Sequence, residues 1–347
     1  MYLVHWPLIA IFSPYTVQHY IFLIVSVFLC SIILHHIFEQ KYLNLEWKSL
    51  TTLIVSLALC NAFLQYSVRE HGFWNMTYPL ELQRIVDINK AQMPVSWVHE
   101  PERFECEEEV FEAEGVESMG YGHCMGGRGN TSVMMIGNSY VMNLRDPIRR
   151  HFHYNYSDFR YIALGEGYGF YGDTSHSQVA LEVSRKDVER YTPDVLFILA
   201  RYTPSLRYPI EENDAQIKQI NENIKFYEKF VKKIYILDSH PLYQEGFADF
   251  FLQCVVNRPE ALETLHLDRR KADEVMKFTK KRFSMVKCTK CHFFDLSHIF
   301  VDGDKYLTFD RDQLISYIDT TVHLSAAGLK MCDSEFERIA REIMDSL

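Results

Sequence analysis

The stretch Ser132-Val-Met-Met-Ile-Gly-Asn-Ser-Tyr140 decides the fold of the C-terminal part of this chain. Its first five residues form a short apolar run that ends at Gly137, which is typical of a buried strand in a parallel sheet. Ser139 follows directly. Its hydroxyl is therefore expected at the carboxyl end of that strand, where open α/β sheets bind their ligands.

Apolar runs of the same kind recur along the chain and alternate with segments of helical spacing. Two further buried strands are predicted at 194–200 and 234–237. Amphipathic helices are predicted at 212–233, 260–283 and 325–344, because apolar residues recur there every three or four positions. Strands and helices in alternation predict an α/β fold with a parallel sheet flanked by helices.

A serine on a sharp turn between a strand and a helix can act as a nucleophile. With Gly137 two residues before it, Ser139 can present its hydroxyl to a crevice in which backbone N–H groups meet a developing oxyanion. The alternative is a turn serine that only caps the following helix. The local motif does not separate these two interpretations.

His323 can supply the base that a catalytic serine needs. It stands just before the predicted helix 325–344, and Asp319 precedes it by four residues. A hydroxyl is a weak nucleophile at neutral pH, so it requires a histidine that accepts its proton and, commonly, an acid that orients the imidazole. Ser139, His323 and Asp319 are therefore the predicted catalytic residues.

Taken together, these two blocks resemble the SGNH hydrolase family, whose first block is normally Gly-Asp-Ser and whose last is Asp-x-x-His. More narrowly, the chain is similar to SGNH domains attached to membrane acyltransferases of family 3, in which the last block continues as in His323-Leu-Ser-Ala-Ala-Gly328. Residues 193–202 resemble a strand of these domains, and Tyr2-Leu-Val-His5-Trp-Pro7 resembles the signature of the final membrane helices. The chain departs from the pattern twice: Asn138 replaces the aspartate of the first block, and Asp319 is one residue further from the histidine than usual.

The resemblance implies an SGNH-hydrolase-like fold that transfers an acyl group from a donor to a hydroxyl-bearing acceptor, with carbohydrate as the expected acceptor. It implies oxyanion or substrate contacts from Asn138, Arg201 and a nearby glycine, which is Gly165, Gly167 or Gly169. It also makes His5 part of a membrane-domain motif. It implies no cofactor.

The N-terminal part is expected to lie in a lipid bilayer. Residues 17–38 are an almost uncharged apolar run of about the 20 residues that a helix needs to cross a bilayer, and 49–66 is a shorter candidate. Residues 1–12 resemble the end of a helix that begins before this sequence, so we expect the C-terminal part of a larger membrane protein. The predicted domains are transmembrane helices over 1–68, a linker and acidic segment over 69–130, and an SGNH-like domain over 131–347.

Charges and sequence patterns predict the side on which the C-terminal domain lies. Lys41 and Lys48 fall in the loop between the two predicted spans and favour a cytoplasmic position for that loop. The C-terminal domain is then lumenal or extracellular. Acceptor patterns for N-glycosylation at Asn75 and Asn155 fall on that side.

The cysteines of the C-terminal region predict disulfides. An even number in an oxidising compartment predicts three bridges, of which Cys106 with Cys124 is the first to expect because the two bracket one loop. Cys288 and Cys291 fit a disulfide better than a zinc site, since no second pair stands at suitable spacing. No metal site is predicted. The six cysteines are Cys106, Cys124, Cys254, Cys288, Cys291 and Cys332.

The net charge of −10 in 347 residues offers no basic patch, so nucleic acid is not an expected partner. The predicted partners are an acyl donor, a hydroxyl-bearing acceptor and the bilayer. Two other functions stay open. One is a lumenal esterase that only hydrolyses acyl groups, and the other is a non-catalytic SGNH-like binding domain, which the substitution at Asn138 favours.

Overall fold

The structure is a computed structural model that divides the chain into two units, residues 1–77 and 78–347. In the first unit it describes α2 (Val17–Leu34) and α4 (Trp47–Arg69), which overlap the two apolar runs predicted to span a bilayer. Within the described ranges, no helix is both long enough and apolar enough to cross a membrane. The described residues are 17–36, 41, 44–69, 78–94, 105–202, 204–241 and 243–347.

The second unit is built on a seven-stranded sheet with the strand order β1-β2-β4-β3-β5-β6-β8. Neighbouring strands from β4 to β8 are parallel, which confirms the predicted parallel sheet. β3, β5 and β6 correspond to the three predicted strands. The parallel strands are β3 (Ser132–Gly137), β4 (Asp158–Leu164), β5 (Val195–Leu199), β6 (Lys233–Leu237) and β8 (Cys291–Phe294).

Two antiparallel strands extend one edge of this sheet. β1 (Cys106–Glu108) pairs with β2 (Ser118–Cys124), and β2 pairs with β4. Both strands lie in the stretch 69–130, for which the sequence predicts a linker and an acidic segment. β2 contains two glycines and only single apolar residues, so no strand pattern marks it in the sequence.

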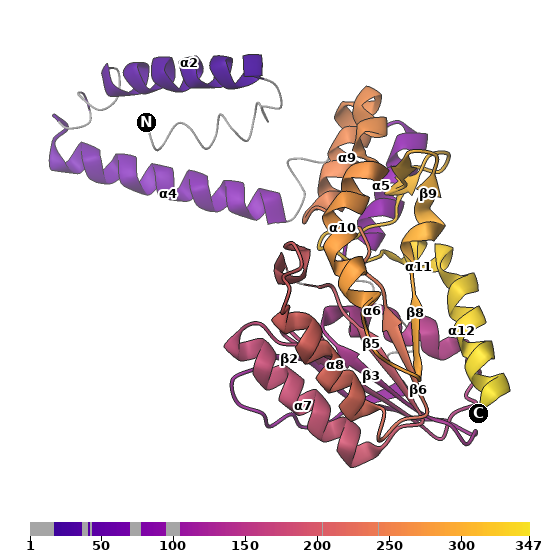
Figure 1. Cartoon of the computed structure of the whole chain (residues 1–347). Helices are drawn as coiled ribbons and strands as arrows, with labels where there is room; N and C mark the ends of the chain where they lie inside the picture. The colour runs from indigo at the N-terminus through magenta and orange to yellow at the C-terminus, as the bar shows by residue number, and fades with distance from the viewer. Residues whose placement is uncertain are drawn as a thin grey trace. The chain divides into compact units, whose positions relative to one another are not determined.

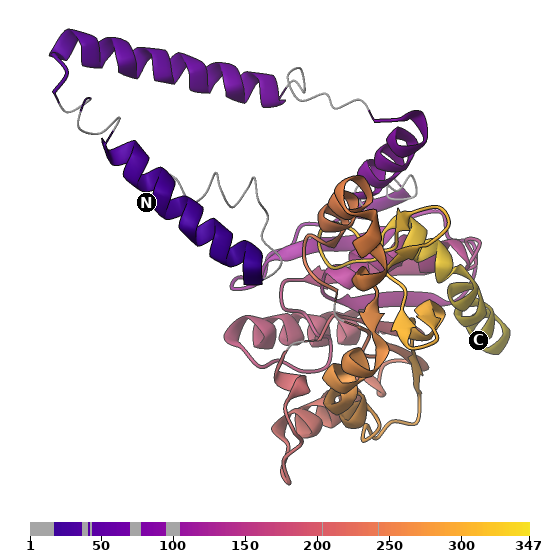
Figure 2. The same cartoon turned by 90° about the horizontal axis from the view of Figure 1, so that it is seen from above.

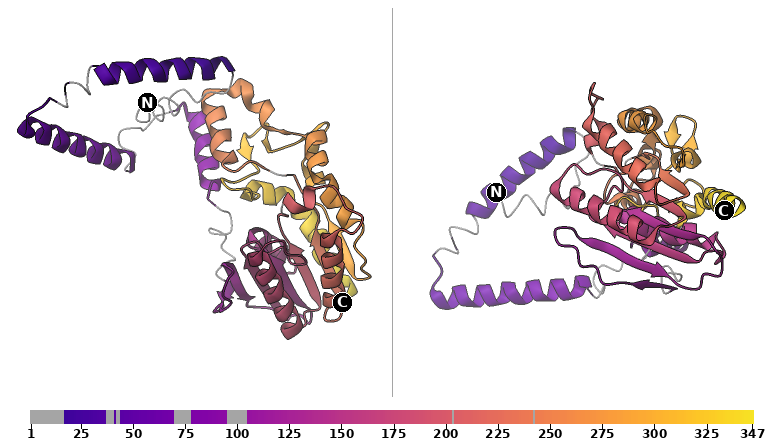
Figure 3. Two further views of the ribbon diagram at one scale, coloured as in Figure 1. Left: turned by 60° about the vertical axis from the view of Figure 1, so that its left-hand side comes forward. Right: turned by 60° about the horizontal axis from the view of Figure 1, so that its bottom comes forward.

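Both faces of the sheet are covered, because alternate residues of each strand point to opposite sides. Val133 and Met135 of β3 belong to one apolar cluster, whereas Met134 and Ile136 belong to the other. The first cluster includes residues of α6, α9 and α12, and the second includes residues of α7 and α8. The result is a three-layered arrangement, which can be followed in Figure 1 and Figure 3.

The helices follow the predicted pattern with two interruptions. The predicted helix 260–283 is a 3-10 turn, η5, followed by α10, and the predicted helix 325–344 breaks at Cys332 into α11 and α12. The remaining predicted helix, 212–233, is observed as α8. The helices are α5 (Leu80–Gln92), α6 (Ser139–Arg150), α7 (Ser175–Tyr191), α8 (Ala215–Tyr227), α9 (Phe247–Asn257), α10 (Arg269–Phe283), α11 (Ala326–Met331) and α12 (Asp333–Ser346).

Short elements near the C-terminus join α5 to the body of the domain. Asn89 of α5 donates to the Leu314 carbonyl at 2.7 Å and accepts the N–H of Ser316 at 2.9 Å. Figure 2 shows α5 beside these later segments. The short elements are η4 (Pro204–Arg207), η5 (Pro259–Leu265), η6 (Ser297–Phe300), β7 (Leu267–Asp268), β9 (Val301–Asp302), β10 (Lys305–Tyr306), β11 (Phe309–Asp310) and β12 (Ile315–Ser316).

Two of the three predicted disulfides are present. Cys106 is bonded to Cys124, which lies directly opposite it in the β1–β2 register, and Cys288 is bonded to Cys291. The prediction of a third bridge is wrong, because Cys254 and Cys332 are free. Both thiols are buried in the first apolar cluster, where a cysteine packs as a small hydrophobic residue.

A buried ion pair holds the loop that follows β5. Arg282 of α10 is 2% exposed and donates to the carboxylate of Asp214, with Nη2 2.6 Å from Oδ2. The same guanidinium donates to the carbonyls of Leu206 and Tyr208 at 2.7 and 2.8 Å. Although burial acts in the opposite direction, the hydrogen bonds from Arg282 hold the pKa of Asp214 below its ordinary value. One side chain therefore satisfies several groups that would otherwise be buried without partners.

We expect Arg282→Met to destabilise the chain by about 3–5 kcal/mol, because it leaves the Asp214 carboxylate buried without its counter-charge. Unfolding in urea, followed by circular dichroism, measures the change. Lys186→Met is the matched control: its partner Glu182 is 3.9 Å away, both side chains are about three-quarters exposed, and the expected change is below about 0.5 kcal/mol. Equal losses in the two variants would contradict the assignment.

Candidate functional site

The turn between β3 and α6 places Ser139 just beyond the carboxyl end of β3, the central strand of the sheet. Gly137 ends β3 with φ of +153°, and a Cβ atom there would lie 1.9 Å from the carbonyl oxygen of Leu199 in β5. No side chain fits that space, so glycine is required for the two strands to approach. Ser139 is then the first residue of α6 and is partly exposed.

Ser139 and His323 are in contact although they are separated by 184 positions. Nε2 of His323 lies 2.7 Å from Oγ of Ser139. The imidazole is buried, with 5% exposure, in the loop before α11. This is the distance of a good hydrogen bond, and across such a contact a histidine is able to accept the proton of a hydroxyl.

α6 holds the histidine loop in place through three further hydrogen bonds. Asn143 donates to the carbonyl of Leu324 at 3.0 Å and accepts its N–H at 3.2 Å. The hydroxyl of Tyr140 donates to the carbonyl of Val322 at 2.7 Å. The helix that carries Ser139 therefore also fixes the backbone on both sides of His323.

Asp319 lies close to the imidazole but is not hydrogen-bonded to it. Its Oδ2 is 3.6 Å from Nδ1 of His323, beyond an ordinary hydrogen bond, and its side chain is fully buried. The hydroxyl of Thr321 lies between them, 2.7 Å from Oδ1 of Asp319 and 2.5 Å from Nδ1 of His323. The sequence patterns single out Asp319 but not Thr321.

Asn138 is the N-cap of α6 and ties this helix to the end of β5. Its Oδ1 accepts the N–H groups of Tyr140 and Arg201, each at 3.2 Å, while its Nδ2 donates to the carbonyl of Arg201 at 3.0 Å. An ionised aspartate has no proton to donate to that carbonyl. The departure from the family aspartate therefore matches this local hydrogen-bonding pattern.

Gly165 and Gly167, two of the three predicted glycines, lie near the serine turn, but their backbone donors are engaged elsewhere. The N–H of Gly165 donates to the carbonyl of Glu117 at 2.8 Å, and that of Gly167 donates to the carbonyl of Leu164 at 3.0 Å. A Cβ atom on Gly167 would lie 2.5 Å from the carbonyl oxygen of Gly137. Gly167 thus allows close packing against the turn.

An aromatic cluster of Tyr140, His240 and His323 borders the Ser139–His323 contact. The ring of Tyr140 lies 5.1 Å from that of His323 and 4.7 Å from that of His240, which follows the carboxyl end of β6. Burial and then the positive charge of Arg201 lower the pKa of His240 to about 4, so its ring is neutral at neutral pH. Its position after a parallel strand is a signal in the sequence that could have identified it.

An apolar hollow lies against the same aromatic cluster. It is lined by Tyr140, Leu237, His240, Tyr243, Leu296 and Phe300, among others. Two of its lining residues, Tyr140 and Leu324, follow Ser139 and His323 directly in the chain.

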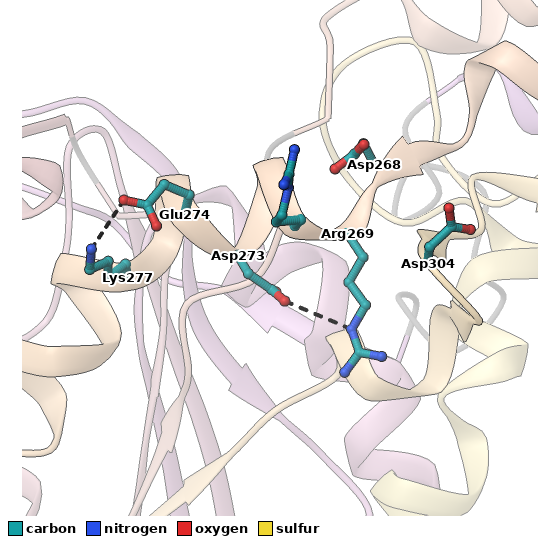
Figure 4. Close-up of a pocket in the computed structure, with 7 residues that line it drawn as sticks. Asp268, Arg269, Asp273, Glu274, Lys277 and Asp304 are labelled. Atoms are coloured by element: carbon teal, nitrogen blue, oxygen red, sulfur yellow. Dashed lines mark hydrogen bonds and ion pairs between the residues drawn. The ribbon is translucent and has the colours of Figure 1, made fainter.

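Figure 4 shows a second, more open hollow on α10 and the β9–β10 turn. It contains none of the predicted site residues. Its charges are mixed in sign and partly pair with each other: Nζ of Lys277 is 3.1 Å from Glu274, and Arg269 is 3.8 Å from Asp273. These side chains have the character of a solvated surface rather than of a site for one kind of ion.

Three of the predicted residues belong to the membrane motif and the glycosylation sites. His5 and Asn75 lie outside the described residues, and Asn155 is exposed after α6.

Among the described residues, one group of side chains has the spacing of metal ligands. Donor atoms of Cys106, Cys124 and Asp146 lie within 4.8 Å of one another. The two sulfurs are bonded to each other, however, and a disulfide does not supply thiolate ligands.

Comparisons with known proteins identify the family of residues 105–338. A search of curated protein sequences gave no match. Among solved structures, the periplasmic domain of a lipopolysaccharide acetyltransferase from Salmonella ser. Paratyphi A has a TM-score of 0.44 at 11% identity, over 62% of this chain and 85% of that chain. A GDSL-like lipase from Bacteroides thetaiotaomicron has a TM-score of 0.34 at 13% identity, over 61% and 88%. Residues 105–338 match the family model described as "SGNH domain (fused to AT3 domains)". Since this match spans more than half of the 347 residues, the chain belongs to the SGNH domain family found fused to AT3 domains.

Proposed function

We propose that this chain transfers acyl groups by ester chemistry, with Ser139 as nucleophile and His323 as base. The observation that carries the proposal is the 2.7 Å contact between Oγ of Ser139 and Nε2 of His323. The family supports this reaction class. The proposed substrates are an acyl donor and a hydroxyl-bearing acceptor, with carbohydrate as the acceptor class.

The reaction proceeds in two halves. Oγ of Ser139 bonds to the acyl carbon while its proton moves to Nε2 of His323, and the carbonyl electron pair moves onto oxygen. Collapse of this intermediate breaks the bond to the leaving group, which takes the proton from His323. In the second half, His323 removes the proton of an acceptor hydroxyl as that oxygen bonds to the acyl carbon. Collapse of this intermediate breaks the bond to Oγ of Ser139, which takes the proton back from His323.

The beginning of α6 is suited to stabilise the oxyanion. The first N–H groups of a helix have no acceptor within it, and they lie at the positive end of the helix dipole. Ser139 is the first residue of α6, so its own N–H is the proposed donor. The N–H groups of Gly165 and Gly167 are engaged with carbonyls, which leaves these glycines a role in shaping the site.

Arg201 is the proposed source of positive charge at this site. Its backbone is joined to Asn138 by two hydrogen bonds, and its charge acts on the neighbouring aromatic groups. Burial raises the pKa of Tyr140, and Arg201 opposes that rise. Arg201 also helps to lower the pKa of His240. A half-buried guanidinium in this position can hold a carbonyl or another electron-rich group of the substrate.

Hydrolysis is the second candidate, and the partial exposure of Ser139 favours it. Water can then replace the acceptor in the second half of the reaction. The alternative of a non-catalytic binding domain would leave Ser139 as a helix residue without reactivity.

The proposal includes attachment to a bilayer and an outer position for the SGNH domain. Supporting it, α2 contains no Asp, Glu, Lys or Arg, and several of its large apolar side chains, including Ile21, Ile24 and Leu29, are more than half exposed. Exposed apolar surface of this kind needs a lipid or protein partner. Glycosylation of Asn75 and Asn155 would accompany the outer position.

A fluorophosphonate probe should label the intact chain at Ser139, because this reagent reacts with serines activated by a base. Ser139→Ala should abolish labelling and lower the hydrolysis of p-nitrophenyl acetate by at least roughly 10³-fold. Ser284→Ala removes an exposed serine at the end of α10 and is the control. A wild-type chain that is folded and unlabelled would refute the catalytic proposal.

Adding a sugar acceptor should divert the acyl group from water to a hydroxyl. Mass spectrometry of the products, with a free monosaccharide or a short oligosaccharide present, measures the ratio of acyl sugar to free acid. Acyl sugar that depends on Ser139 identifies a transferase. Free acid alone, at every acceptor concentration, identifies an esterase.

Replacing the guanidinium of Arg201 should weaken the reaction without unfolding the domain. We expect Arg201→Met to lower kcat/KM by roughly 10²-fold, about the value of one oxyanion donor, and Arg201→Lys to retain part of the activity. Lys218→Met on α8, whose side chain is 79% exposed, controls for the loss of a positive charge. If Arg201→Met has the kinetics of wild type, the proposed role of Arg201 in binding substrate is wrong.

A further inference from the structure

The loop from Asp319 to His323 is one residue longer than the spacing of the family pattern. In the structure, the carboxylate of Asp319 lies too far from the imidazole of His323 for a hydrogen bond. Oδ2 of Asp319 and Nδ1 of His323 are 3.6 Å apart. Oδ2 has no hydrogen-bond partner among the described residues. Oδ1 accepts the N–H groups of Thr321 and His323 at 2.8 and 3.1 Å. The carboxylate is thus held by its own loop rather than by the imidazole.

The hydroxyl of Thr321 lies between Asp319 and His323, and its chemistry determines the direction of both hydrogen bonds. An ionised carboxylate can only accept, so the single hydroxyl proton of Thr321 is donated to Asp319, 2.7 Å away. The oxygen of Thr321 must then accept a hydrogen from Nδ1 of His323 at 2.5 Å. With its hydrogen on Nδ1, a neutral His323 has a lone pair on Nε2, the nitrogen that faces Ser139.

We propose that Thr321 is a positioning residue that connects Asp319 to His323 and fixes the tautomer of the imidazole; the inference rests on the proposed acyl-transfer function. When Ser139 attacks, its proton moves to Nε2 of His323. The Nδ1–H remains on the imidazolium and donates to Thr321. Thr321 keeps its own proton on the bond to Asp319, so no proton passes through it.

Neighbouring residues hold Thr321 in this position. The hydroxyl of Thr320 points away from the imidazole and donates to the carbonyl of Met93 at 2.7 Å. On the other side, the carbonyl of Val322 accepts the hydroxyl of Tyr140. The loop is therefore anchored before and after Thr321, and its two adjacent threonines have different partners.

Thr321→Val and Thr321→Ser separate the hydroxyl from the shape of the side chain. Thr264→Val is the control, because it makes the same exchange at an exposed threonine whose hydroxyl donates to the carbonyl of Ala261. In the full chain with histidines labelled by ¹⁵N, NMR reads the tautomer and titration midpoint of His323, assigned by comparison with His323→Gln. Wild type should carry its hydrogen on Nδ1. Thr321→Val should transfer population to the Nε2–H form and lower the midpoint by about one pH unit, as expected for the loss of one hydrogen bond to a charged group.

Kinetics provide the second readout. Thr321→Val should lower kcat for p-nitrophenyl acetate by roughly 10²-fold and move the acid limb of kcat/KM to lower pH, since the imidazolium loses its partner. Thr321→Ser should restore both values to within a few-fold of wild type. Thr264→Val should match wild type in tautomer, midpoint and pH profile.

Two results would overturn the proposal: an unchanged tautomer and midpoint in Thr321→Val, or a Thr321→Ser variant as impaired as Thr321→Val. The two readouts also separate this proposal from the proposed function. A wild type that neither hydrolyses esters nor reacts with fluorophosphonate refutes acyl transfer. The NMR comparison still decides whether Thr321 controls His323.

Discussion

The close approach of β3 and β5 at Gly137 and Leu199 is the constraint on which the site depends. A side chain at Gly137 would collide with the carbonyl of Leu199, so only glycine permits the turn from strand to helix at this point. Because the strands are this close, the amide of Asn138 can bond to both backbone groups of Arg201. The same residue caps α6. Contacts of Gly137 and Asn138 therefore fix the conformation of the turn, and none of them involves the side chain of Ser139.

His323 comes from the C-terminal end of the chain, and hydrogen bonds from α6 hold its loop beside Ser139. Asn143 and Tyr140 bond to the backbone of Leu324 and Val322, on either side of His323. These bonds are largely buried, and a buried polar group without its partner costs roughly 1–3 kcal/mol. The fold thus penalises any displacement of the histidine loop. The 2.7 Å contact between Ser139 and His323 follows from that arrangement.

Much of the sheet and the central pair could be predicted from the sequence. Apolar runs mark β3, β5 and β6, because strands buried on both faces carry apolar residues at successive positions. β4 lacks this mark, since Arg160 stacks on Tyr191 and pairs with Glu109 at the partly exposed edge toward β2. The antiparallel strands β1 and β2 also lack a run of apolar residues that would predict a strand. Among the disulfides, the two local pairs were predictable from position, whereas Cys254 and Cys332 are thiols of the apolar core.

The sequence by itself determined that Ser139 follows a buried strand and a glycine and that His323 precedes a helix, because both are local patterns. It also determined that an extra residue separates Asp319 from His323. Only the tertiary structure decided how the side chains of this loop are placed. The carboxylate of Asp319 and Nδ1 of His323 are 3.6 Å apart, and the hydroxyl of Thr321 contacts both. The tertiary structure likewise decided that the ring of His240 packs against Tyr140, and that the N–H groups of Gly165 and Gly167 donate to the carbonyls of Glu117 and Leu164. Such contacts join segments far apart in the chain, and no local spacing specifies the distance between their atoms.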